Sequence, residues 1–116
     1  MIYNQREIVL VPFPYSDLTA IKKRPVLVIS NNKFNNESED VVVAAITSKT
    51  FSDEYSVAFN DQDLEFGILP EDSVIKTAKL FTVSKSRIVK KFSIINNITF
   101  HKVTSKIEKL IASENL

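Results

Sequence analysis

The sequence of 116 residues contains no cysteine and no tryptophan, and it has only one glycine and one histidine. Without cysteine, the chain cannot form a disulfide, a thiolate nucleophile or a cysteine-ligated zinc site. A single glycine excludes the glycine-rich loops that cradle phosphates. One histidine, His101, excludes an acid–base mechanism with two histidines from one chain and gives no basis for a histidine metal site. We therefore expect no metal and no cofactor.

Long apolar runs are also missing. No stretch reaches the roughly 20 apolar residues that a membrane-spanning helix needs. The first residues, MIYNQREIVLVPF, do not resemble a signal peptide, because their apolar run is short and follows the charged Arg6 and Glu7. We therefore expect a cytoplasmic protein without a membrane segment.

The net charge is only +1, but the charges are unevenly distributed. Residues 37–72 contain ten acidic residues and one cation, whereas residues 73–116 contain nine cations and two acidic residues. Three more cations are adjacent at residues 22–24, in the segment KKRP. If the fold brings the basic regions together, they form a local face suited to one phosphate strand. Ordinary solvated surface is the alternative, and charge alone leaves both open.

The hydrophobic pattern predicts five or six short strands and one helix. Strands are expected at residues 7–13, 24–30, 41–48 and 55–59, and one or two more at 73–83. Residues 41–48, VVVAAITS, do not alternate, so we expect core on one face and core or a partner subunit on the other. Apolar residues at three- and four-residue steps predict a helix over residues 97–112, with Asn97 as its N-cap. The pattern predicts a small, mainly β barrel with a C-terminal helix, in one domain over residues 1–116.

The connections between these elements are read from their polar composition. Residues 15–23 and the asparagine-rich residues 31–40 are predicted to be loops. Residues 86–95 are predicted to be a connection that includes a turn of helix. We expect Gly67, the single glycine, at a turn position with positive φ.

Candidate site residues stand at two predicted strand ends. Arg24 begins one strand, and Thr47 and Ser48 end another. Because strand ends meet at the rims of a barrel, Arg24 and Thr47 can share one rim. A guanidinium can grip a phosphate and stabilise a five-coordinate phosphorus, and a hydroxyl can donate to a phosphoryl oxygen or relay a proton. Each residue also has a structural explanation, as a solvated charge or as a β-forming residue.

Four segments, in this order and spacing, carry a family resemblance: EIVLVPFPYSDLT, KKRPVLVIS, DVVVAAITS and GILPEDSVIKTAKLFTV. Together they look like the MazF/PemK toxins of bacterial type II toxin–antitoxin systems, which are sequence-selective mRNA interferases. The resemblance implies an SH3-like, CcdB/PemK-like barrel with a C-terminal α-helix, a homodimer, and a cognate antitoxin protein as partner. It also implies metal-independent cleavage of single-stranded RNA, in which the RNA's own 2′-OH attacks the adjacent phosphate and leaves a 2′,3′-cyclic phosphate and a 5′-OH.

The resemblance also implies roles for individual residues. Arg24, in the RPVLVI segment, is expected to stabilise the charge that develops at phosphorus. Thr47, in the AAIT segment, is expected to hydrogen-bond at the scissile phosphate and to assist proton transfer. Lys23, Ser48 and Lys79 are expected to contact the RNA.

The chain departs from the family pattern at two places. The family usually has glycine where this chain has Arg6, and again where it has Ala20-Ile21 in the loop before the basic run. The second departure bears on cleavage-site preference, because that loop flanks the expected active site. A non-catalytic, CcdB-like gyrase inhibitor and an SH3-like nucleic-acid-binding module remain alternative functions for this fold. Arg24 and Thr47 together favour the endoribonuclease, because a gyrase inhibitor has no need of that pair.

Overall fold

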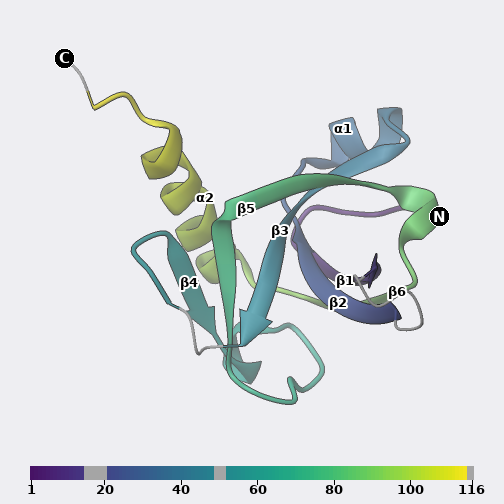
Figure 1. Ribbon diagram of the computed structural model, residues 1–116, viewed down its shortest axis with the longest axis horizontal. Coiled ribbons are helices and arrows are strands. Elements are labelled where there is room, and N and C mark those ends of the chain that lie inside the picture. Colours follow the sequence, from purple (N-terminus) through teal and green to yellow (C-terminus); the bar gives the residue numbers. More distant parts are fainter. Residues whose placement is uncertain (15–20, 49–51, 115–116) are drawn as a thin grey trace.

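The fold is a curled six-stranded antiparallel sheet with a C-terminal helix at its side (Figure 1). The computed structural model describes residues 1–14, 21–48 and 52–114. The strands are β1 (Glu7–Pro14), β2 (Ile21–Val28), β3 (Asp40–Ser48), β4 (Ser56–Phe59), β5 (Ser73–Ser84) and β6 (Lys90–Ile94). The helices are α1 (Asn32–Glu37) and α2 (Asn97–Ile111), with short 3-10 turns η1 (Asp61–Asp63) and η2 (Lys85–Arg87). The strand order in space is β4-β5-β3-β2-β1-β6.

The two edge strands, β4 and β6, are joined through the segments that follow them. Leu64 forms an antiparallel bridge with Ile95, and the backbone N–H of Glu65 donates to the carbonyl of Ile94 at 2.8 Å. These contacts hold the curled sheet as a half-barrel. The small, mainly β barrel with a C-terminal helix that the sequence predicts is thereby confirmed.

Two apolar clusters lie on opposite faces of the sheet. Ile8 and Leu27, which face each other across β1 and β2, belong to the cluster that packs against α2. The next pair along the ladder, Val9 and Val26, belongs to the second cluster. This alternation follows from the pleat of a strand, which sends successive side chains to opposite faces.

Strand β3 is covered on both faces, as its unbroken apolar sequence predicts. Val41 and Val43 are fully buried in the second cluster, whereas Ala44 and Ile46 are buried in the first. The chain's own core therefore supplies both covers along this part of β3.

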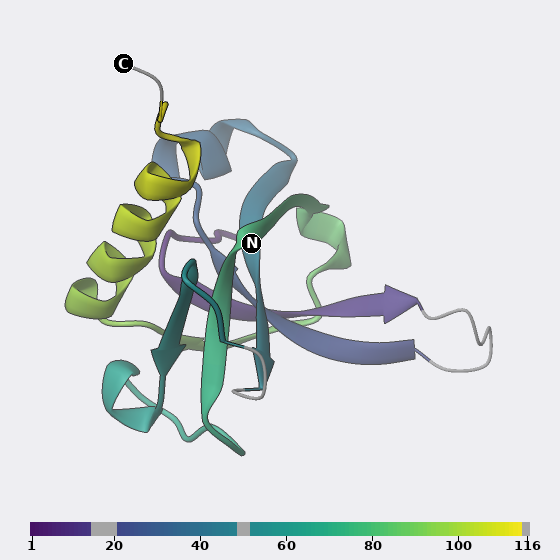
Figure 2. The same ribbon diagram turned by 60° about the vertical axis from the view of Figure 1, so that its left-hand side comes forward.

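Strands β1 and β2 extend past the rest of the sheet as a two-stranded arm (Figure 2). Strand β2 begins at Ile21, so the strand start predicted at residue 24 was three residues late. Arg24 consequently lies inside a paired strand, opposite Val11, and not at the strand entrance. Residues 15–20 of the predicted loop lie outside the described residues.

The loop predicted over residues 31–40 was wrong in part, because it contains α1. The side chain of Asn31 caps this helix by accepting a hydrogen bond from the backbone N–H of Phe34 at 2.8 Å. Asn35 is fully buried, and its amide donates to the carbonyl of Ser30 at 2.9 Å. The polar residues that suggested a loop are thus internal partners of a short helix.

The connection predicted over residues 86–95 contains an edge strand, β6, that the sequence analysis missed. This strand pairs with β1, and its two lysines, Lys90 and Lys91, are exposed while Ser93 is buried. The expected turn of helix exists slightly earlier, as η2.

Helix α2 confirms the predicted C-terminal helix, with its N-cap one residue earlier than expected. Its N-cap is Asn96, whose side chain accepts from the backbone N–H of Thr99 at 2.8 Å, and not Asn97. Phe100 and Val103 bury the apolar side of the helix against the sheet. Within the described ranges, no helix is long and apolar enough to cross a membrane.

Positive φ angles occur at Gly67 (+86°), as predicted, and at Arg6 (+78°). Arg6 stands where the family resemblance leads us to expect glycine, the residue that tolerates this conformation best. Its guanidinium donates to the Glu65 carboxylate at 2.8 Å and to the carbonyl of Ile95 at 2.7 Å. These contacts hold the strained residue and tie the start of β1 to the segment that joins the edge strands.

Candidate active site

Arg24 and Thr47 come from neighbouring strands and project from the same face of the sheet. The β2–β3 ladder pairs Val28 with Val43 and Val26 with Ala45. Arg24 and Thr47 each lie two residues beyond the last of these pairs, Val26 and Ala45. Because side chains two residues apart share a face, both residues lie on the side of the sheet that carries Val26 and Ala45. Arg24 and Thr47 thus both stand next to the end of the β2–β3 ladder.

A cavity of about 360 Å³ lies at the end of this ladder, where Arg24 and Thr47 meet residues of the opposite face, Leu10, Pro25 and Ile46 among them. Its polar lining comprises Arg24, Thr47, Ser48, Glu71 and Ser73, and its apolar lining comprises Leu10, Pro25, Ile46, Leu69, Pro70 and Phe92. The lining residues come from β1, β2, β3, β5, β6 and the segment before β5. The cavity thus combines one cation and several hydroxyls with an apolar wall and a carboxylate.

Thr47 also lines a second hollow, of about 280 Å³, whose other lining residues come from the segment before β4 and from β5. These residues are Asp53, Lys76, Ala78 and Lys79. Thr47 therefore stands on the boundary between an apolar cavity with an arginine and a hollow with two lysines. The structure brings Lys79, an RNA-contact candidate from the sequence, close to Thr47.

Lys76 is a candidate site residue that the sequence analysis missed. It pairs with Ala45 of β3, whereas Leu80 pairs with the adjacent Ala44, so β5 carries an irregularity between them. In a regular strand, residues 76 and 79 would face opposite sides of the sheet. The irregularity places Lys76 and Lys79 in one hollow, and such features are common beside functional sites.

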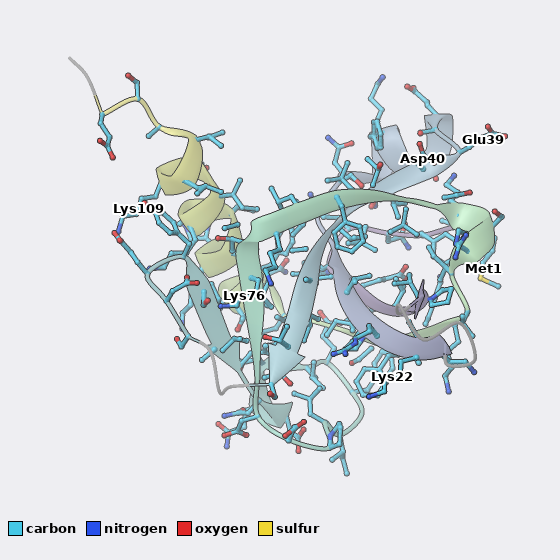
Figure 3. The ribbon with its side chains drawn as sticks, viewed as in Figure 1. Met1, Lys22, Glu39, Asp40, Lys76 and Lys109 are labelled. Carbon is cyan, nitrogen blue, oxygen red and sulfur yellow. The ribbon has the colours of Figure 1, made fainter. Side chains whose placement is uncertain are left out.

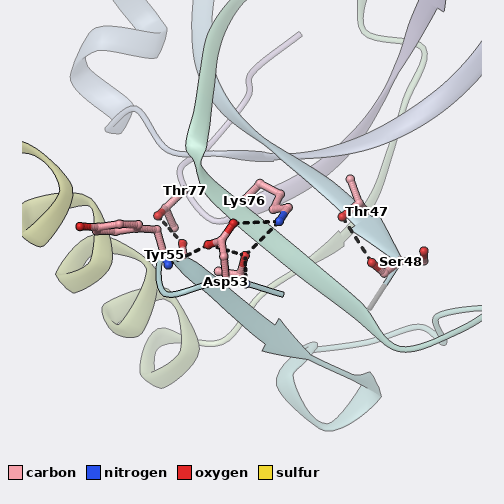
Figure 4. Close-up of polar contacts among 7 residues, drawn as sticks. Thr47, Ser48, Asp53, Tyr55, Lys76 and Thr77 are labelled. Carbon is pink, nitrogen blue, oxygen red and sulfur yellow. Dashed lines mark hydrogen bonds and ion pairs between the residues drawn. The ribbon is translucent and has the colours of Figure 1, made fainter. Parts of the chain in front are cut away.

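The Lys76 side chain is only 12% exposed, and its ammonium has well-defined partners. It lies 3.1 Å from the Asp53 carboxylate and 3.3 Å from the hydroxyl of Ser56 (Figure 4). In Figure 3, Lys76 lies beside β5 near the middle of the molecule, and Lys22 lies on the arm of β2. The hydrogen bond from Lys76, followed by that from the backbone N–H of Tyr55, lowers the pKa of Asp53 below its usual value of 3.8.

Thr47 and Lys23, which the sequence also predicts as site residues, have looser surroundings. The Thr47 hydroxyl donates to the carbonyl of Ser48 at 3.4 Å, a long contact that leaves the hydroxyl easy to redirect towards a ligand. Lys23 is exposed, and the alternation of β2 points it to the face opposite to that of Arg24. Lys23 lines neither of the two hollows, so its role in RNA contact stays a prediction.

In the part of the chain that the structure describes, no three histidine, cysteine or acidic side chains gather to hold a metal ion. His101 lies on an exposed position of α2, away from Arg24 and Thr47 in sequence and in neither hollow.

Comparison with protein families gives one decisive match. The sequence model described as PemK-like, MazF-like toxin of type II toxin-antitoxin system matches residues 4–111. This range contains all six strands, both hollows and α2. The chain belongs to the PemK/MazF family. The membership indicated by the four sequence segments is thereby confirmed. No sequence among curated proteins matches the chain significantly.

Several solved structures share the fold across nearly the whole chain. An endoribonuclease from a mycobacterial species, in complex with its cognate antitoxin, aligns with a TM-score of 0.76 at 18% identity, covering 92% of each chain. MazE–MazF of Deinococcus radiodurans (Form III) aligns with a TM-score of 0.77 at 16% identity, covering 96% of this chain and 97% of that one. Mycobacterium tuberculosis toxin MazF-mt6 aligns with a TM-score of 0.73 at 17% identity, covering 90% and 94%. At these identities the similarity establishes the PemK/MazF fold.

Proposed function

We propose that this PemK/MazF family member is a metal-independent endoribonuclease toxin that cleaves single-stranded RNA, with Arg24 and Thr47 as its catalytic residues. The observation that carries the proposal is that both residues line one cavity next to the end of the β2–β3 ladder. The similar folds of an endoribonuclease and of MazF proteins support the same activity. An arginine and a hydroxyl suit phosphate chemistry, because a guanidinium can hold two phosphoryl oxygens at once.

The proposed reaction is an internal transesterification of the RNA. The 2′-oxygen attacks the adjacent phosphorus as its proton departs, and the bond from phosphorus to the 5′-oxygen breaks. The 5′-oxygen takes up a proton, so the products are a 2′,3′-cyclic phosphate and a 5′-OH. Arg24 stabilises the negative charge that grows on the phosphoryl oxygens, and Thr47 hydrogen-bonds there and assists proton transfer.

The remaining lining residues suit the rest of an RNA substrate. Lys76 and Lys79 place positive charge on the other side of Thr47, where a neighbouring phosphate would lie. The apolar wall of the larger cavity offers a surface on which an unstacked base can rest. Glu71, in the same wall, adds a carboxylate that can accept the 2′-OH proton when ionised.

We also propose the partners and the setting of this activity. A cognate antitoxin is supported by the antitoxin complexes among the similar structures. A homodimer is supported by family membership, and light scattering at micromolar concentration is expected to give twice the chain mass. Sequence selectivity towards mRNA and a cytoplasmic location complete the proposal.

One experiment tests the activity directly. Purified protein is incubated in EDTA with single-stranded oligonucleotides of varied sequence, as RNA and as matching DNA, beside the Arg24→Ala variant. Cleavage of RNA alone, resistant to EDTA and lost in the variant, is the expected result. Cyclic-phosphate ends, identified by mass spectrometry, check the chemistry. Intact RNA across all sequences would sink the proposal and favour a non-catalytic gyrase inhibitor or nucleic-acid-binding module.

A further inference from the structure

The segment Asp53–Ser56, which precedes and begins β4, lies between helix α2 and strand β5. On the helix side, the Lys109 ammonium lies 2.7 Å from the Glu54 carboxylate, and the Lys106 ammonium donates to the Glu54 carbonyl at 2.7 Å. Lys109 also lies 5.8 Å from the centre of the Tyr55 ring. Two lysines on one side of α2 therefore hold Glu54 and its neighbour.

On the other side, the same segment is bound to β5 next to the candidate active site. Asp53 forms the ion pair with Lys76, and the carbonyl of Tyr55 accepts from both the backbone N–H and the hydroxyl of Thr77 (Figure 4). Thr77 is fully buried, so these hydrogen bonds are shielded from water.

Contacts within the segment make it behave as one unit. One oxygen of the Asp53 carboxylate accepts from the backbone N–H of Tyr55 at 2.8 Å and from the hydroxyl of Ser56 at 3.1 Å. The other oxygen binds Lys76. Asp53 is thus fixed by the turn that carries Glu54, and a displacement of Glu54 also displaces the carboxylate that holds Lys76.

We propose that Glu54 is a positioning residue: held by α2, it fixes Asp53 and thereby keeps the Lys76 ammonium beside Thr47 for RNA binding. This inference rests on the proposed function and extends it to a segment that does not itself touch the reacting atoms. It makes the setting of the active site depend on helix α2. An isolated exposed ion pair contributes little by itself, but this pair acts through a chain of hydrogen bonds that reaches a buried residue.

A charge-swap series tests this role. The variants are Glu54→Lys, Lys109→Glu and the two combined, and KM and kcat are measured on a single-stranded RNA that the wild type cleaves. The matched control is the exposed pair on α1, Lys33 and Glu37, whose charged atoms lie 3.0 Å apart and which lines neither hollow. The control variants are Glu37→Lys, Lys33→Glu and their combination.

The two explanations of an effect predict opposite signs for Glu54→Lys. Replacing an acid by a lysine makes the protein more basic, so long-range attraction alone lowers KM for RNA. Loss of positioning raises KM instead, by roughly three- to tenfold, with a smaller change in kcat. We expect KM to rise in Glu54→Lys, to recover in the swapped double variant, and to stay level or fall in Glu37→Lys.

Hydrogen exchange at the Thr77 amide gives a second readout that needs no RNA. We expect faster exchange in Glu54→Lys, wild-type exchange in the swapped variant, and no change in the α1 controls. If Glu54→Lys behaves like Glu37→Lys in both measurements while the wild type cleaves RNA, the inference is overturned and the proposed function stands. If the wild type cuts no RNA, the proposed function falls, and so does the role of Glu54 in RNA binding. The exchange data then still decide whether Glu54 holds the segment.

Discussion

Lys76 and Asp53 form an ion pair at 3.1 Å within the hollow that Thr47 lines, with the lysine almost buried and the carboxylate about half exposed. The cation that faces the candidate active site is therefore held in place by a carboxylate of the chain itself. An RNA phosphate that approaches Lys76 meets an ammonium already held in place, which reduces the entropy lost on binding.

Removing the Thr47 hydroxyl is expected to reduce RNA cleavage by roughly a hundredfold or more, since one lost donor to a developing charge typically has that effect. Thr47→Val makes this change at nearly constant shape, and the loss is expected in kcat/KM. The matched control is Thr82→Val at an exposed position of β5. Equal activity of the two variants would remove Thr47 from the mechanism.

Acidification is expected to release the Asp53–Ser56 segment only at low pH. The hydrogen bond from Lys109 lowers the pKa of Glu54 below its usual value of 4.5, and the hydrogen bond from Lys76 lowers that of Asp53 below 3.8. A carboxyl with a lowered folded-state pKa stabilises the fold above its unfolded pKa, and this contribution disappears as pH falls through the folded value. The difference in melting temperature between wild type and Glu54→Gln should therefore be constant near neutral pH and shrink only below pH 4.5.

The alkaline side has the opposite sign. Glu54 raises the pKa of Lys109 above 10.5, so the contribution of this cation is complete below 10.5 and is lost as pH rises through the higher folded value. A difference between wild type and Glu54→Gln that changes between pH 5 and pH 10 would contradict both expectations, which follow from the same ion pairs.

Arg6 combines backbone strain with two stabilising contacts, and two substitutions separate these effects. Arg6→Ala loses the contacts to Glu65 and Ile95 but keeps a side chain at φ +78°, whereas Arg6→Gly loses the contacts and relieves the strain. We expect the glycine variant to be more stable than the alanine variant by about 1 kcal/mol, measured by urea unfolding. An alanine variant at least as stable as the glycine variant would show that no strain is stored there.

Gly67 is expected to tolerate asparagine better than alanine. A β-carbon at Gly67 would meet nothing closer than the Ser93 hydroxyl at 4.0 Å, so space does not forbid a side chain. The φ of +86° is what disfavours a side chain. It costs about 1 kcal/mol of stability for alanine and less for asparagine, which adopts this backbone conformation more readily. A chemical denaturation series of the three proteins measures the order, and equal stabilities would contradict it.

The sequence predicted the strands best where apolar residues dominate. Residues 41–48 were assigned to a strand with both faces covered, and β3 occupies nearly the same range. The prediction of secondary structure failed where polar residues have partners within the fold. Asn31 and Asn35 suggested a loop, yet one caps α1 and the other is buried against Ser30. Strand β6 was missed because a short edge strand with exposed lysines lacks a clear alternating pattern.

Part of the candidate site was predictable from the sequence. Arg24 and Thr47 stand in recognisable sequence segments, so their types and order along the chain pointed to a shared location, although Arg24 lies inside β2 and not at its start. Lys76 was not predictable, because it joins Lys79 only through the irregular register of β5 opposite Ala44 and Ala45. A single sequence does not show where a strand leaves its regular pairing.

The pairing of β1 with β6 also determines how much of the chain must be synthesised before the candidate active site can form. Leu10 and Phe92 lie far apart in the sequence, yet both line the cavity beside Arg24. Glu7 pairs with Ile94, so the sheet joins the beginning of the chain to a segment near its end. During synthesis, a chain that has not yet released residue 94 can fold its first strands but cannot complete this wall. A nascent chain is therefore expected to lack the complete wall of this cavity until residue 94 has emerged from the ribosome.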